Sequence, residues 1–114
     1  MGTNVREDFD RTYKDFLDAY ESHFIDGETL DLVRNAVVYA YPDEARQISI
    51  KNGIMKEGDE DFFDVDILEL FERVQDKSRM VRELEIAINY GKKVSSASEL
   101  VEIIQGFRAN RTAQ

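Results

Sequence analysis

Apolar residues recur along most of this chain at intervals of three and four positions, which is the period of an amphipathic α-helix. The first stripe predicts a helix over residues 6–24. The second predicts a helix that Asp26 caps and that ends before Pro42, because the residue before a proline is disfavoured in helical geometry. The two stripes comprise Phe9, Tyr13, Phe16, Leu17, Tyr20 and Phe24, and then Leu30, Val33, Val37, Ala40 and Tyr41. We expect the aromatic residues of the first stripe in the core, with a partner-binding stripe as the alternative.

Three more helices follow from the same periodicity in the second half of the chain. They are predicted over residues 61–75, 78–91 and 96–111, with Ser78 as the cap of the second. The third begins with Ser96 and a glutamate three residues later, which is the spacing of a capping box. Their apolar faces comprise Phe63, Ile67, Leu70, Phe71 and Val74, then Met80, Val81, Leu84, Ala87 and Ile88, then Leu100, Val101, Ile104 and Phe107.

Residues 43–58 leave two local structures open. Asn52-Gly53 lies between short apolar runs and is typical of a type I′ turn in a β-hairpin. The alternative is a short helix over residues 43–51 that uses Gly53 as its C-terminal cap. The helix is favoured because an isolated two-stranded hairpin has little stability of its own.

These stripes predict an all-α protein, a compact bundle of five or six helices in a single domain over residues 1–114. The composition, 42% hydrophobic and 34% charged, is typical of a globular domain. No apolar run approaches the roughly 18 residues that a membrane span requires. The chain has no cysteine, which excludes disulfides and thiolate metal sites, and a cytoplasmic location is expected.

Charge is distributed unevenly along the chain, which has a net charge of -9. Residues 1–72 carry 19 acidic and 7 basic residues, a net charge of -12, whereas residues 73–114 carry 5 acidic and 8 basic residues, a net charge of +3. An acidic protein repels phosphate backbones, so nucleic acid is not expected as a partner. Basic protein surfaces are.

Two clusters of charge are candidate partner-binding surfaces. The acidic cluster comprises Asp59, Glu60, Asp61, Asp64 and Asp66, and the basic cluster comprises Arg73, Lys77, Arg79 and Arg82. If the two lie on different sides, the acidic cluster of one molecule meets the basic cluster of the next in a head-to-tail contact. The alternative is that both are solvated faces, with the acidic side chains stabilising a helix N-terminus.

No arrangement of residues predicts catalysis, a metal site or a cofactor. Counted from Asp59, a calcium-binding EF-hand would need glycine at Asp64 and glutamate at Leu70. His23 is the only histidine and has no second ligand at a metal-binding helical spacing, so it is expected to cap carbonyls or face water. The scattered glycines form no phosphate-binding loop.

The segment from Ile25 to Pro42 resembles the first helix of the bacterial effector-associated domains, a group of death-fold-like interaction domains. The matching features are the cap at Asp26-Gly27-Glu28, the apolar stretch from Leu30 to Ala36, and the aromatic residues from Tyr39 to the proline.

A later segment, residues 67–91, resembles the fourth and fifth helices of the same group. Its polar corner over residues 75–78 is followed by Met80, Glu83 and Leu84 in an apolar-acidic-leucine pattern. Both segments are also similar to death-effector and CARD-like domains. The resemblance extends over residues 25–105, which leaves residues 6–24 as an extra N-terminal helix, and the tryptophan common in that family's fourth helix is absent.

The resemblance implies a non-catalytic adaptor that docks with a like domain, its own or that of an effector, and so recruits the effector in bacterial defence. Two alternatives stay open. The chain has the acidity of an inhibitor or immunity protein that blocks a basic enzyme or mimics nucleic acid. It also has the size of a carrier protein with Ser78 as the modified serine, although Lys77 and Arg79 replace the neighbours that the carrier motif requires.

Overall fold

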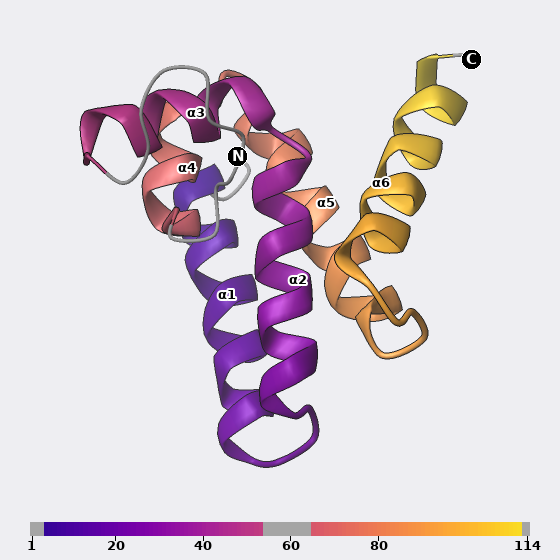
Figure 1. The fold of residues 1–114 in the computed structure, drawn as a ribbon. Helices are drawn as coiled ribbons and strands as arrows, with labels where there is room; N and C mark the ends of the chain where they lie inside the picture. The colour runs from indigo at the N-terminus through magenta and orange to yellow at the C-terminus, as the bar shows by residue number, and fades with distance from the viewer. Residues whose placement is uncertain (1–3, 54–64, 113–114) are drawn as a thin grey trace.

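The computed structural model describes residues 4–53 and 65–112, with side chains as far as Arg108. These residues form six helices and no strand, so the predicted all-α class is confirmed (Figure 1). The helices are α1 (Val5–Glu21), α2 (Gly27–Tyr39), α3 (Pro42–Lys51), α4 (Ile67–Arg73), α5 (Lys77–Gly91) and α6 (Ala97–Thr112).

The arrangement places α5 at the centre of the bundle. It packs against α1, α2 and α6, while α3 and α4 pair with each other at one end of α2 (Figure 1). The largest buried side chains come from all six helices: Phe9, Phe16, Val33, Val37, Ile48, Ile67, Leu70, Phe71, Met80, Leu84, Leu100 and Ile104. One hydrophobic core therefore joins the helices.

Helix α1, predicted as an extra element, is part of that core. Phe9 and Phe16 are buried, and the Phe9 ring stacks on Phe71 with centroids 4.2 Å apart. The end of the predicted stripe is different, because Tyr20 is 41% exposed and Phe24, beyond the helix, is 74% exposed. The core expectation is therefore right for the first part of the stripe and wrong for its last two residues.

The junction between α2 and α3 is set by a capped start of α2 and by Pro42 at the start of α3. Helix α2 starts at an Asp26 side chain that accepts from the Thr29 N–H at 2.8 Å, as predicted. It ends at Tyr39, and Pro42 becomes the first residue of α3, where its missing N–H has no consequence. The hairpin alternative is wrong, because its first strand, residues 48–50, lies in α3, and Gly53 follows this helix with a left-handed φ of 73°. Its second strand, residues 54–55, lies outside the described residues.

Helices α4 and α5 begin at other residues than predicted. Asp66 caps α4, so that helix starts at Ile67 rather than at residue 61, and the predicted part over residues 61–64 lies outside the described residues. Asp76 rather than Ser78 caps α5, because its carboxylate accepts from the Arg79 N–H at 3.0 Å. An aspartate at either position satisfies the free N–H groups of a first turn.

The capping box of α6 is present in a shifted form. The Ser96 hydroxyl accepts from the Glu99 N–H at 3.3 Å, while the Glu99 carboxylate accepts from the N–H of Ser95 rather than that of Ser96. The apolar face of α6 is narrower than predicted, because Leu100 and Ile104 are buried but Phe107 is 39% exposed.

Helices α2 and α5 approach each other closely at Gly91, the last residue of α5. A Cβ atom added there would lie 2.6 Å from a methyl carbon of Val33, a fully buried residue of α2. Gly91 has no left-handed backbone angle, so its backbone does not require glycine as a helix stop. Glycine is needed here because the two helices lie so close together.

Gly91→Ala is expected to lower the free energy of unfolding by about 1–3 kcal/mol, because the added methyl overpacks a rigid β-branched neighbour. Gly106→Ala is the matched control, since a Cβ there meets nothing within 4 Å. It should raise stability by about 0.5–1 kcal/mol through helix propensity alone. Urea unfolding followed by circular dichroism measures both, and equal effects of the two substitutions would contradict the proposed role of Gly91.

Candidate functional site

A buried carboxylate, that of Glu83 in α5, is the main polar feature of the core, with only 3% of the residue exposed. The Tyr41 hydroxyl donates to its Oε1 atom. Arg108 of α6 donates to both oxygens, from Nη2 to Oε1 at 2.8 Å and from Nε to Oε2. Such pairing is what allows a carboxylate to lie among apolar side chains.

Two guanidinium groups flank the Tyr41 ring beside this carboxylate. Arg108 lies 4.9 Å and Arg79 lies 5.4 Å from the ring centroid, distances typical of cation–π contacts. Arg79 also donates to the Tyr41 hydroxyl at 3.4 Å, and Arg108 donates to the carbonyl of Ala40 at 3.1 Å. We call Tyr41, Arg79, Glu83 and Arg108 the Glu83 cluster.

The electrostatics of the cluster favour a fixed structural contact over acid–base chemistry. Burial raises the pKa of Tyr41 to about 12, and its hydrogen bond to Glu83 adds to the shift. The hydrogen bond to Glu83 likewise raises the pKa of Arg108 above its usual value. Both carboxylate oxygens already accept hydrogen bonds, so the cluster joins the end of α2 to α5 and α6.

The four residues of the predicted basic cluster are all described, and their role as a partner-binding surface stays a prediction. Arg79 belongs to the Glu83 cluster, and Arg73 donates to the side chain of Gln47 at 3.3 Å. Of the four predicted residues, Arg82 is exposed on the surface of α5.

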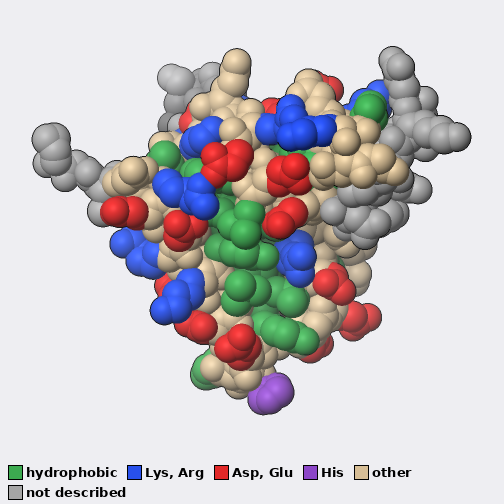
Figure 2. Space-filling view, turned by 90° about the vertical axis from the view of Figure 1, so that its left-hand side faces the viewer, with side chains coloured by type: hydrophobic (Ala, Val, Ile, Leu, Met, Phe, Trp, Pro, Cys, Tyr) green, Lys and Arg blue, Asp and Glu red, His purple; other side chains and the backbone are tan. Residues whose placement is uncertain are grey.

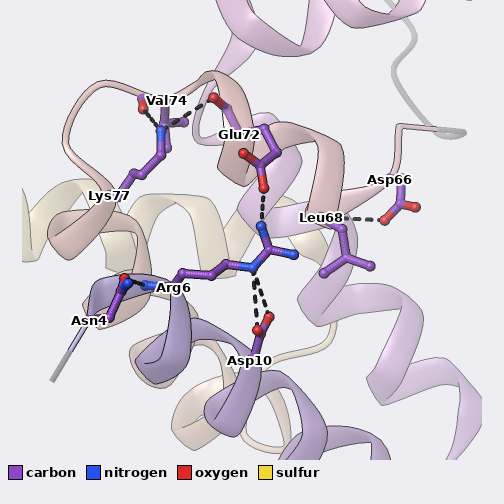
Figure 3. A network of polar contacts seen from close by, with 8 residues as sticks. All are labelled: Asn4, Arg6, Asp10, Asp66, Leu68, Glu72, Val74 and Lys77. Atoms are coloured by element: carbon purple, nitrogen blue, oxygen red, sulfur yellow. Dashed lines mark hydrogen bonds and ion pairs between the residues drawn. The ribbon is translucent and has the colours of Figure 1, made fainter.

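Lys77, the fourth predicted residue, is held by the end of α4. Its ammonium donates to the carbonyl of Val74 at 2.7 Å and to that of Glu72 at 3.3 Å (Figure 3). The Glu72 side chain in turn pairs with Arg6, which also contacts Asp10 of α1 at 3.1 Å (Figure 3). The pair of Arg6 and Glu72 joins α1 to α4, and Lys77 caps the end of α4.

The predicted acidic cluster lies almost entirely outside the described residues. This applies to Asp59, Glu60, Asp61 and Asp64. Asp66 is described, and its carboxylate accepts from the Leu68 N–H at 2.9 Å as the cap of α4 (Figure 3).

An apolar band lies on the face away from α6 (Figure 2). Figure 2 shows hydrophobic side chains gathered in a band that runs down this face toward His23, with charged side chains on both sides. Helix α1 supplies three partly exposed apolar residues at helical spacing, Tyr13, Leu17 and Tyr20, which we call the α1 strip. His23 is exposed beyond it, in a left-handed conformation with φ of 67°.

Metal-binding groups and membrane-spanning helices can be assessed for the described ranges, residues 4–53 and 65–112. These ranges contain no group of three or more His, Asp or Glu side chains placed to hold a metal ion. Within the same ranges, no helix has the length and apolar character needed to cross a membrane.

Comparison of the chain with protein-family models, with curated protein sequences and with solved structures finds no match. The death-fold-like arrangement therefore stays a prediction.

Sequence reasoning missed the Glu83 cluster, although the signals were present. Glu83 lies between the core positions Met80 and Leu84, so the helical period places an acidic side chain on the buried face of α5. Arg108 continues the four-residue spacing of the apolar face of α6. A lone acid on one apolar face and a lone base on another predict a buried ion pair, although not which helices meet.

Tyr41→Phe is expected to lower the free energy of unfolding by about 1.5–3 kcal/mol, because Glu83 loses a buried hydrogen-bond donor to a charged group. Tyr13→Phe is the matched control, since its hydroxyl has no hydrogen bond among the described residues. Denaturant unfolding of both variants checks this prediction, and a Tyr41→Phe protein as stable as the Tyr13→Phe protein would contradict it.

The raised pKa of Tyr41 also predicts a pH dependence. The folded state holds this proton more tightly than the unfolded chain, where the pKa is near its ordinary value of 10.0. The stabilisation is therefore complete below about pH 10 and is lost as the pH rises toward about 12. A tyrosinate absorbance titration should show a late component that the Tyr41→Phe variant lacks; an unchanged titration would contradict the assignment.

Proposed function

We propose that this protein is a non-catalytic interaction module that binds a protein partner through the α1 strip. The observations that carry the proposal are the exposed apolar band of Figure 2 and the exposure of the α1 strip, in which Tyr20 is 41% exposed. Contiguous apolar surface bordered by charge is typical of protein interfaces, and tyrosine is a frequent energetic centre of them. The 74% exposed Phe24 extends the same end of the molecule.

Charge around the strip indicates the kind of partner. Asp15, Asp18 and Glu21 are exposed on α1, and the protein as a whole carries a net charge of -9. A partner with an apolar centre and a basic border would be steered toward this face, while the apolar contact would slow dissociation. If the partner is a second copy of this chain, its basic border includes the exposed Arg82.

The biological role in this proposal comes from the resemblance to bacterial effector-associated domains. It is that of a cytoplasmic adaptor in bacterial defence, which recruits or regulates an effector through a like domain. The net acidity supports a second candidate, an inhibitor or immunity protein for a basic enzyme. That candidate predicts a one-to-one complex with steep salt dependence and no self-association.

Tyr20→Glu is the variant that tests the α1 strip, because it places a charge at the most exposed residue of the strip. Sedimentation velocity of the purified protein is expected to show self-association that this variant weakens at least tenfold (about 1.4 kcal/mol). If the partner is an effector, it can be captured from the source cells and purified. Its reconstituted complex with the Tyr20→Glu protein should show the same loss of affinity.

Gln105→Glu is the matched control, because it adds the same charge at an exposed position of α6. It should leave both measurements unchanged, and circular dichroism should show equal helix content in both variants. If the Tyr20→Glu protein keeps every self-contact and every captured partner of the unmodified chain, the α1 strip is not the docking surface.

A further inference from the structure

Helix α6 lies at the edge of the bundle (Figure 1). It packs against α2 and α5, which form the walls of the site that it occupies. The walls include Tyr39 on α2 and Ile86 and Tyr90 on α5, which lie beside α6 residues. We call this the α6 groove. Along the part of α6 whose side chains are described, only Leu100 and Ile104 are fully buried.

The packing of α6 in the groove leaves space on two sides. A hollow of about 410 Å³ lies at its N-terminal half, and another of about 160 Å³ lies near its C-terminal half. They are lined by Tyr39, Ala97, Ser98 and Val101, and by Arg82, Glu83, Ile86, Phe107 and Arg108. An element with few buried apolar side chains and incomplete packing opens more readily than the core to which it is attached.

The C-terminal half of α6 is held instead by a polar contact with strict geometry. Arg108 reaches both Oε atoms of Glu83 and the carbonyl of Ala40 at the end of α2. Leu100, Ile104 and Arg108 recur at intervals of four and so share one face of the helix. The α6 groove therefore selects two apolar anchors followed by a guanidinium, because only that group matches a buried carboxylate in two places.

The connection to α5 is short and lies at the surface. It consists of residues 92–96, of which Lys92, Lys93, Ser95 and Ser96 are exposed. A change in its backbone angles would move α6 as a unit relative to α5.

We propose that the α6 groove is a helix-binding site, that α6 occupies it within one chain, and that α6 of a second copy replaces it in a dimer by reciprocal exchange. The second copy is the occupant because it carries the same two anchors and the same guanidinium, so every contact of the groove is kept and only residues 92–96 change conformation. The proposal deepens the interaction role proposed above but uses a surface separate from the α1 strip.

A peptide of residues 95–112 with a fluorescent label tests the groove directly when it is titrated into the full chain. The peptide should bind an Arg108→Ala chain at least tenfold more tightly than the unmodified chain, because the variant's own helix competes less while the peptide keeps its Arg108. An Arg11→Ala chain is the matched control, since Arg11 pairs with Asp8 outside the groove, and it should behave as the unmodified chain. A peptide with Arg108→Glu should not bind.

Equal binding of the normal and Arg108→Glu peptides to the Arg108→Ala chain, or no binding to either chain, overturns the proposal. If Arg108→Ala prevents folding, Arg108→Lys replaces it with at least a threefold preference expected, because an ammonium cannot reproduce the two-point contact. An equal affinity for the Arg108→Lys and unmodified chains overturns the proposal in that case.

Hydrogen exchange measured by mass spectrometry separates opening of α6 from loss of the whole fold. In the Arg108→Ala chain, exchange should rise at least tenfold in residues 97–108 and remain unchanged in α1, α2 and α5. An even rise over all helices overturns the proposal.

Sedimentation velocity decides whether a second copy is the occupant. The unmodified chain should form a dimer whose fraction rises with protein concentration, because its exchanged α6 keeps Arg108, and a chain that binds the peptide but stays monomeric at every concentration overturns the exchange. Adding Tyr20→Glu should leave peptide binding unchanged. A failure of the α6 exchange can therefore be distinguished from a failure of the α1 strip as a docking surface.

Discussion

The buried carboxylate of Glu83 is the constraint on which the arrangement of the helices depends. A charged oxygen inside an apolar core is tolerated only where donors surround it, and here the donors come from outside its own helix. Tyr41 follows the end of α2 and Arg108 lies on α6, so one group determines where both elements meet α5. Leu84 and Ile104 and their apolar neighbours supply the stabilisation of the core, but apolar contacts alone do not specify such a register.

Periodicity was sufficient to predict five of the six helices of the described residues, and the reasons are local. The caps at Asp26 and Ser96, the proline at residue 42 and the left-handed Gly53 each act within a few residues of the chain, so their signals are readable. The errors arose where two local signals compete. Asp76 and Ser78 are both good caps, and the choice between them depends on how α4 ends.

The candidate site was less predictable because it is made by contacts between distant parts of the chain. Charge clustering in sequence suggested a basic surface, yet Arg79 turns toward Tyr41 and Lys77 toward the carbonyls that end α4. Closeness along a helix does not tell which basic side chains make contacts inside the protein. The acid that matters most to the interior, Glu83, belonged to no charge cluster, and its partner Arg108 lies 25 positions away.

The link between α2 and α3 consists of Ala40 and Tyr41 alone, set between the end of one helix and the proline that opens the next. Both residues contribute to the buried charge contact, one through its carbonyl and one through its hydroxyl. An inserted residue would shift the phenol relative to the end of α2 and so withdraw it from the carboxylate. This junction should therefore tolerate no change of length during evolution, unlike ordinary surface loops, and related chains should be recognisable by an invariant spacing between the aromatic residue and the proline.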